Sequence, residues 1–305
     1  MEIVRGFSDV AIPKVIIPTR DALYPLLEAH KSDIESVPRK TFQFGETERH
    51  KLDVYYPKID SSVKAPILLL AYGGGFNSGE RVFDPPYDLA HRNIGAFYAK
   101  RGILTVITDY RLVPNVTYPA QAEDVKDALI WVINNAENMT QGFDIEVDTR
   151  RVFLIGHSAG GAHVATIFLA PGLLPSEYWS HVKGIILMGA AVRIGPKEDL
   201  APTISQYYGS EEEMRAREPI ALLRQASQET MDSLPKVLML KSEKEPKAIW
   251  EGNTAFLKVL NEKLPSPVEE IIMEGHNHIS PVYALSGGEG ELFGERIAQW
   301  IKDTE

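Results

Sequence analysis

The stretch FLIGHSAGGAHVATIF, residues 153–168, decides how the rest of the chain is interpreted. Apolar residues lead up to Ser158, glycines flank it at positions 156 and 160, and small residues with a helical pattern follow. The pattern G-x-S-x-G at a strand-to-helix turn is typical of a nucleophilic serine on strained backbone, whose neighbours must lack bulky side chains. The alternative is a glycine-rich turn with an incidental serine. The flanking strand and helix favour the nucleophile.

Short apolar runs recur on both sides of this stretch, and most are continuous, as in strands that are buried on both faces. Amphipathic helix patterns at residues 119–138 and 289–303 accompany them. Strands that alternate with helices predict the α/β class, with a mainly parallel, doubly wound sheet and helices on both faces. The predicted strands are PILLLA (66–71), ILTVIT (103–108), RVFLIG (151–156), GIILMG (184–189), KVLML (236–240) and VEEIIM (268–273).

Other segments have patterns that a parallel sheet does not explain. Residues 41–47 and 50–56 indicate an antiparallel hairpin at one edge of the sheet. Residues 1–40 precede the sheet, and residues 195–233 form a long insertion between two predicted strands. Insertions at the carboxyl edge of such sheets usually cover a ligand crevice. We therefore expect a single domain over residues 1–305, in which 1–40 and 195–233 form a small cap.

Composition excludes several classes of protein. The 305 residues are 44% apolar, the formal net charge is −10, and cysteine is absent. The negative charge argues against nucleic-acid binding, and the lack of cysteine excludes disulfides and thiolate chemistry. The N-terminus shows no secretory signal pattern, and no apolar run approaches the length of a membrane span. We expect a cytoplasmic protein that binds neither nucleic acid nor membrane. Its oligomeric state is open, and a homo-oligomer is possible.

A glycine run follows the first predicted parallel strand. The sequence Tyr72-Gly-Gly-Gly-Phe76-Asn leaves backbone N–H groups free to point at a ligand. Acyl transfer needs such donors for the oxyanion of the tetrahedral intermediate. We predict that the N–H groups of Gly74, Gly75 and Ala159 form this oxyanion hole. A nucleotide-binding loop is disfavoured because the pattern G-x-x-x-x-G-K-[ST] is absent.

A serine nucleophile needs a base and an acid, which follow it in the chain order Ser, Asp or Glu, His. Of the later histidines, His163 lies on the helix after the serine and His181 has no special context. His276 and His278 share the loop EGHNHIS after the last predicted strand, and spacing alone leaves the base open between them.

The acid is sought after the strand KVLML, in the segment KSEKEPK. No aspartate occurs between Asp232 and Asp303, so an acid at this strand end must be a glutamate. The candidates are Glu243 and Glu245. Both could instead be solvated charges in a lysine-rich segment.

Four motifs together resemble a known family: YGGGFN, DYRLVPNVTYPAQAEDVKDALIWV, GHSAGGAH and GHNHIS. Their order and spacing are similar to the α/β-hydrolase esterases of the hormone-sensitive-lipase and kynurenine-formamidase type, from about residue 40 onward. The family's oxyanion loop reads HGGG or HGGxWN. Here Tyr72 stands for the histidine and Phe76 for the tryptophan, so the backbone donors are kept while the usual side-chain anchor is missing. In the family, the DYRL motif supplies charge pairs that fix a loop.

The resemblance implies roles for the candidate residues. His278 matches the family's triplet around the catalytic histidine, and Glu245 matches the aspartate of its G-x-x-D pattern, with Pro246 following. We therefore expect Ser158, His278 and Glu245 to form a catalytic triad. His276 would then hold the loop or bind substrate. The expected substrate-binding residues are Tyr72, Phe76, His157 and His276.

The predicted function is hydrolysis of a small-molecule ester or amide through an acyl-enzyme, without a metal or organic cofactor. The resemblance makes an aryl formamide, an aryl ester or a lactone plausible substrates. A non-catalytic binding protein on the same scaffold is one alternative, because fold does not fix function. A lyase or dehydratase that reuses the same residues is another.

Overall fold

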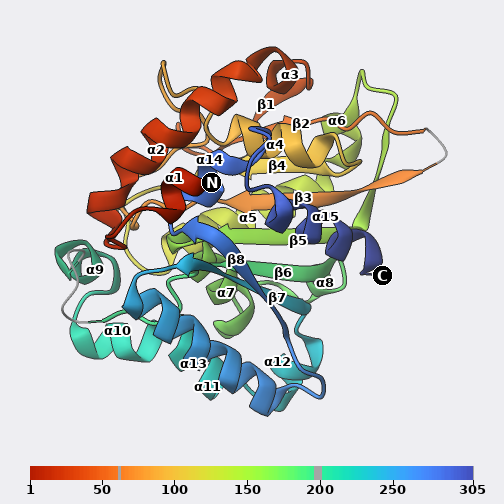
Figure 1. Ribbon diagram of the computed structural model, residues 1–305. Coiled ribbons are helices and arrows are strands. Elements are labelled where there is room, and N and C mark those ends of the chain that lie inside the picture. Colours follow the sequence, from red (N-terminus) through yellow and green to blue (C-terminus); the bar gives the residue numbers. More distant parts are fainter. Residues whose placement is uncertain (61–62, 196–200, 305) are drawn as a thin grey trace.

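A central sheet of eight strands organises the computed structural model, in which residues 1–60, 63–195 and 201–304 are described (Figure 1). The strands are β1 Arg39–Gln43, β2 Lys51–Tyr55, β3 Lys64–Ala71, β4 Leu104–Thr108, β5 Glu146–His157, β6 Val182–Met188, β7 Lys236–Lys244 and β8 Glu269–Asn277. Their order across the sheet is β1-β2-β4-β3-β5-β6-β7-β8. The strands from β3 to β8 are parallel, which confirms the predicted mainly parallel sheet.

The predicted edge hairpin is also confirmed. Strand β1 pairs with β2 in antiparallel fashion, and β2 joins the parallel part of the sheet through β4. Every residue of β4 is buried, which explains why its sequence is a continuous apolar run. Strand β5 begins at Glu146, five residues before the apolar run that predicts it, because its polar first half pairs with β3 near Lys64.

Helices cover both faces of the sheet (Figure 1). On one face, α7 packs against β3, β5 and β6; on the other, α4 packs against β2 and β4. The segment predicted as one helix at 119–138 is divided, because α5 ends at Asn134 and α6 begins at Ala136. The helices between the strands and at the C-terminus are α4 Arg92–Ala99, α5 Ala120–Asn134, α6 Ala136–Thr140, α7 Ala159–Leu169, α8 Ser176–Trp179, α13 Lys247–Lys263, α14 Ser280–Ala284 and α15 Leu292–Asp303.

The two segments predicted as a cap are helical. The N-terminal one holds α1 Glu2–Arg5, α2 Ile12–Ala29 and α3 Lys31–Glu35. The insertion holds α9 Ala201–Tyr208, α10 Glu211–Arg217, α11 Pro219–Gln225 and α12 Gln228–Ser233, while its residues 196–200 lie outside the described residues. Within α2, Leu23 and Leu27 are buried, so this face of the helix is packed against the rest of the protein.

Segment α2 lies against the loop that carries the late histidines. The Asn277 side chain donates to the Thr19 hydroxyl over 2.8 Å, and both side chains are fully buried. The first segment of the chain thus packs directly on the last strand. In the ranges that the structure describes, no helix combines the length and apolar character needed to cross a membrane.

Candidate active site

Ser158 lies at a sharp turn between β5 and α7. Its φ of 52° and ψ of −118° put a non-glycine residue in a strained region of backbone space. A Cβ on Gly156 would lie 2.5 Å from the carbonyl oxygen of Gly160, and one on Gly160 would lie 2.1 Å from that of Ala71. Only glycine at both positions lets the start of α7 approach the strands this closely. Ser158 is partly exposed at the carboxyl edge of the sheet.

A continuous chain of hydrogen bonds begins at Ser158. Its Oγ lies 2.9 Å from Nε2 of His278, and Nδ1 of His278 lies 2.7 Å from Oε2 of Glu245. An ionised carboxylate only accepts hydrogen bonds, so Nδ1 carries the proton and Nε2 accepts from the serine hydroxyl. The side chains of His278 and Glu245 are 2% and 1% exposed. The structure thus brings together the three predicted catalytic residues in the order that proton transfer requires.

The competing candidates lie elsewhere. Glu243 is exposed, and its Oε2 accepts the N–H of Gly275 over 2.7 Å. His276 uses both ring nitrogens, one at 2.8 Å from the Ser280 hydroxyl and one at 2.9 Å from the Gly290 carbonyl oxygen. Desolvation by burial lowers the pKa of His276 to about 4. Of the two roles expected for it, His276 therefore holds the loop and has no free nitrogen for a substrate.

The loop that carries two of the predicted oxyanion donors begins beside Ser158. A Cβ on Gly73 would be 3.0 Å from Cβ of Ser158, so the glycine loop passes directly over the serine. Within the described residues, the N–H groups of Gly74, Gly75 and Ala159 have no acceptor.

The orientation of two peptide planes explains why the N–H groups of Gly75 and Ala159 remain available to a ligand. The Gly74 carbonyl oxygen accepts from the N–H and the hydroxyl of Ser78, at 3.0 and 2.7 Å. The Ser158 carbonyl oxygen accepts from the N–H of Ala191 over 2.9 Å. In a trans peptide the next N–H points opposite to the carbonyl, so those of Gly75 and Ala159 point away from these contacts.

Two aromatic residues predicted to bind substrate are turned inward. Tyr72 and Phe76 are each 1% exposed. The Tyr72 hydroxyl donates to Oδ1 of Asp109 over 2.6 Å, so the loop has a side-chain anchor after all, of a kind that the sequence does not predict. The Phe76 ring stacks on Tyr207, with ring centroids 4.8 Å apart. These placements argue against direct substrate contact by Tyr72 and make Phe76 part of a packed cluster.

His157 also has a different place from the one expected. Its Nε2 lies 2.9 Å from the backbone carbonyl oxygen of His278 and must donate to it, because a carbonyl only accepts. Burial, followed by the charge of His278, lowers the pKa of His157 to about 3, so its ring is neutral in ordinary buffers. His157 therefore supports the backbone of His278 instead of facing a ligand.

A cluster of aromatic and aliphatic side chains packs next to the serine. It joins the glycine loop, the start of α7 and helix α9, and its buried members are Phe76, Val113, Ala159, Ala162, Ile194, Ile204, Tyr207, Tyr208 and Met214. Tyr118 packs against it, with its ring stacked 5.4 Å from that of Tyr208. His163 contacts the cluster edge-on, and within the described residues neither of its ring nitrogens has a hydrogen-bond partner.

Gly189 is a site residue that the sequence analysis missed. It follows β6 with a φ of 50°, and a Cβ there would lie 2.6 Å from Oε1 of Glu245 and 3.2 Å from Nδ1 of His278. Any side chain would therefore collide with the acid and the base. The signal was the glycine that ends the predicted strand GIILMG, which marks a close approach of backbone to other groups.

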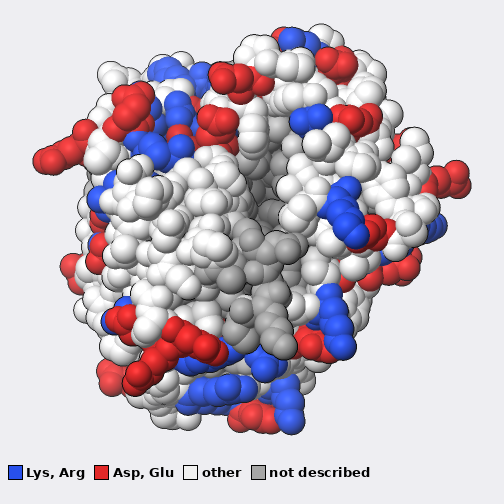
Figure 2. Space-filling view, turned by 90° about the vertical axis from the view of Figure 1, so that its left-hand side faces the viewer, with Lys and Arg blue, Asp and Glu red and all other residues white. Residues whose placement is uncertain are grey.

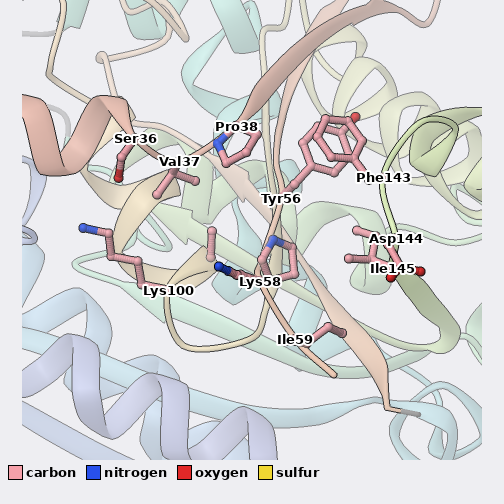
Figure 3. A pocket seen from close by; sticks show the side chains of 12 residues that line it. Ser36, Val37, Pro38, Tyr56, Lys58, Ile59, Lys100, Phe143, Asp144 and Ile145 are labelled. Atoms are coloured by element: carbon pink, nitrogen blue, oxygen red, sulfur yellow. The ribbon is translucent and has the colours of Figure 1, made fainter. Parts of the chain in front are cut away.

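A groove of about 580 Å³ lies at the other end of the sheet, and its lining includes the stacked rings of Tyr56 and Phe143, 3.6 Å apart (Figure 3). Its residues come from segments 36–38, 56–59, 99–100 and 143–145, which precede the parallel strands β3, β4 and β5 or flank β1 and β2. Ser158 and its partners follow strand ends, so the groove is separate from them. Across the described ranges, no three His, Asp or Glu side chains are grouped so as to hold a metal ion.

Parts of this chain are similar to known proteins. The family model BD-FAE matches residues 52–171, a segment that includes the glycine loop and Ser158 but ends before Glu245 and His278. Probable carboxylesterase 7 of Arabidopsis thaliana is 35% identical over 112 residues, which cover 36% of this chain and 35% of the relative. Arylacetamide deacetylase of Oryctolagus cuniculus is 35% identical over 114 residues, 37% of this chain and 27% of the relative. The match thus spans about a third or less of these two relatives.

Solved structures extend the likeness to the whole fold. A hyperthermophilic esterase from the archaeon Pyrobaculum calidifontis superposes with a TM-score of 0.68 at 20% identity, covering 99% of this chain and 96% of the other. At this identity the likeness establishes the fold alone. The fold is that of the α/β-hydrolases, as the resemblance in the sequence predicts.

Proposed function

We propose that this protein, which has the α/β-hydrolase fold and is similar to esterases of the hormone-sensitive-lipase type, is a serine hydrolase that cleaves a small carboxylic ester or amide. The observation that carries the proposal is the hydrogen-bonded chain from Ser158 through His278 to Glu245. A serine hydroxyl is a poor nucleophile until a base removes its proton, and an imidazole needs an acid to fix its tautomer. This chain of contacts supplies both.

The proposed reaction has two halves. Ser158 Oγ attacks the carbonyl carbon while its proton passes to Nε2 of His278, and the tetrahedral intermediate forms. His278 then gives that proton to the leaving alcohol or amine, which departs and leaves an acyl-serine. Water, deprotonated by His278, attacks the acyl carbon, and the carboxylic acid leaves as the proton returns to Ser158. Glu245 stabilises the imidazolium in both halves through its bond to Nδ1.

The negative charge of each tetrahedral intermediate falls on the former carbonyl oxygen. The N–H groups of Gly74, Gly75 and Ala159 are the proposed donors to this oxygen. Their placement costs no reorganisation during the reaction because peptide geometry and the bonds of neighbouring carbonyls already fix two of them. Removal of one such donor typically lowers kcat by about 10²–10³-fold.

A neutral and aromatic substrate fits the surroundings best. Figure 2 views the molecule from the side on which Figure 1 draws α9 and α10; this face is hollowed, and among the described residues at the border of the hollow most of the surface is uncharged. The side chains packed next to the serine around Phe76, Tyr207 and Tyr208 are apolar or aromatic, and these three rings are each 1–2% exposed. A relative named arylacetamide deacetylase points the same way. We propose aryl esters, aryl formamides and lactones as substrates, with residues 1–40 and 195–233 forming the cap.

The direct test is turnover of p-nitrophenyl acetate, an aryl formamide and an aryl lactone by the wild type and by Ser158→Ala. The wild type should hydrolyse at least one of them, and Ser158→Ala should lose this activity while its circular dichroism stays unchanged. Full activity in Ser158→Ala would refute the mechanism. Substrate binding without turnover by the wild type would instead favour a binding protein on this scaffold.

A further inference from the structure

Tyr72 begins the loop that carries the oxyanion donors, and its hydroxyl makes two hydrogen bonds. It donates its single proton to Oδ1 of Asp109 over 2.6 Å and accepts from Nη2 of Arg49 over 2.7 Å. Its ring lies between those of His91 and Tyr110, stacked at centroid distances of 5.2 and 4.9 Å. Both the ring and the hydroxyl are therefore fixed.

Arg49 closes the same loop at its other end. The nitrogen that donates to Tyr72 also donates to the carbonyl oxygen of Gly79 over 2.7 Å. Nε of Arg49 donates to the Tyr110 carbonyl oxygen over 2.7 Å, which orients the guanidinium plane. A single side chain thus ties together the first and last residues of the segment 72–79.

The acceptor of the phenol proton is held by its own partners. Oδ1 of Asp109 accepts the backbone N–H of Arg81 over 2.7 Å, and the Arg81 guanidinium pairs with Asp109 and with the fully buried Asp53. Burial first, and then the charge of Asp109, raise the pKa of Tyr72 well above its usual value of 10. The phenol therefore keeps its proton and continues to donate to Asp109.

Building on the proposed hydrolase function, we propose that Tyr72 is a positioning residue for the oxyanion hole. Held between Arg49 and Asp109, its hydroxyl fixes the loop so that the N–H groups of Gly74 and Gly75 stay beside Ser158. It is not itself an oxyanion donor, because its only proton is committed to Asp109. The anchor acts on the transition state, since the loop's donors meet full negative charge only there.

The test compares Tyr72→Phe with Tyr98→Phe. Both changes delete a buried hydroxyl, but within the described residues the Tyr98 hydroxyl has no partner, so it is a matched control. For Tyr72→Phe we expect kcat on p-nitrophenyl acetate, per titrated active site, to fall about 10–100-fold with KM within about twofold. Within the segment 73–79, the amides of Asn77 and Ser78, which donate to the Gly74 carbonyl oxygen, should exchange with deuterium about tenfold faster. Tyr98→Phe should match the wild type in kcat and in exchange at these amides.

The outcomes separate this inference from the proposed function. If Tyr72→Phe retains wild-type kcat and wild-type exchange at residues 73–79, the anchor is refuted although the hydrolase stands. A lower yield of active sites with unchanged kcat per site would also refute it, because that result describes a purely structural role. If the wild type hydrolyses no ester, the proposed function fails, and faster exchange in Tyr72→Phe alone would still support the anchor of the loop.

Discussion

Two regions next to Ser158 are built on different principles. In one, hydrogen bonds tie His278 to Glu245 and to the ring of His157, which donates to the His278 backbone. In the other, the aromatic cluster around Phe76 and Tyr207 packs by ring contacts, and His163 beside it has no hydrogen-bond partner in the described part of the chain. Both regions are buried, yet both ring nitrogens of His278 are paired in the first, whereas in the described part of the chain neither ring nitrogen of His163 is paired in the second.

The difference indicates that the first region, around His278, requires more precise geometry than the second. Hydrogen bonds are directional, so the first region fixes the base within a narrow range of positions. The burial of apolar surface is non-directional, so the second region can tolerate substitutions that conserve side-chain volume at a modest cost. Substitutions in the first region should therefore reduce catalysis, whereas those in the second should change stability. Two predictions test this division, and the larger effect comes first.

The acid of the first region gives the largest expected effect. Glu245→Gln keeps the shape of the side chain but removes the charge that fixes the tautomer of His278. We expect kcat to fall on the order of 10³-fold. In Glu243→Gln, an exposed side chain changes and kcat should stay within about twofold of the wild type.

Steady-state rates on p-nitrophenyl acetate at pH 8 check this pair, with thermal unfolding curves to show that both variants fold. A greater loss in Glu243→Gln than in Glu245→Gln would transfer the role of acid to Glu243. Equal and small losses would mean that no carboxylate orients the base.

The second region gives a smaller effect, on stability. Burial lowers the pKa of His163 to about 3, against about 6.5 in an unfolded chain. Between these values the unfolded state binds a proton that the folded state does not, so the free energy of unfolding falls as the pH drops below about 6.5. His163→Leu removes this term and two unpaired polar atoms. It should be more stable than the wild type by about 1–3 kcal/mol at pH 7.5.

At pH 5 the unfolded wild type takes up a proton on His163 that the folded state does not bind. The stability advantage of His163→Leu should therefore be larger at pH 5 than at pH 7.5, by roughly 2 kcal/mol. Urea unfolding at both pH values measures it, and kcat should stay within about twofold because the leucine does not touch the reacting groups. A variant that is less stable than the wild type at pH 5 would show that the imidazole has a partner. A large loss of kcat would break the division between the two regions.

The sequence predicts what is local. The turn at Ser158 could be recognised because the strand, both glycines and the helix lie within one continuous stretch. His278 and Glu245 needed the resemblance as well, because spacing alone left His276 and Glu243 as alternatives. These four glutamate and histidine side chains lie at least 85 residues after Ser158, and the matched family segment does not reach them.

The sequence does not predict contacts between distant segments. Tyr72 was expected to face a substrate because it is aromatic and adjoins the glycines; its partner Asp109 is 37 residues away and fixes it inward. His157 donates to a backbone carbonyl 121 residues away. Polar side chains near a site satisfy hydrogen bonds wherever the fold offers them, and only the structure shows where those partners are.

The activation of Ser158 by His278 is tested by the reaction of the wild type with a fluorophosphonate, followed by intact-mass analysis and peptide mapping. We expect one adduct per chain, on Ser158, absent in Ser158→Ala and formed far more slowly in His278→Gln. An adduct on another serine, or reaction at Ser158 that is equally fast in His278→Gln, would contradict the claim that His278 activates this hydroxyl.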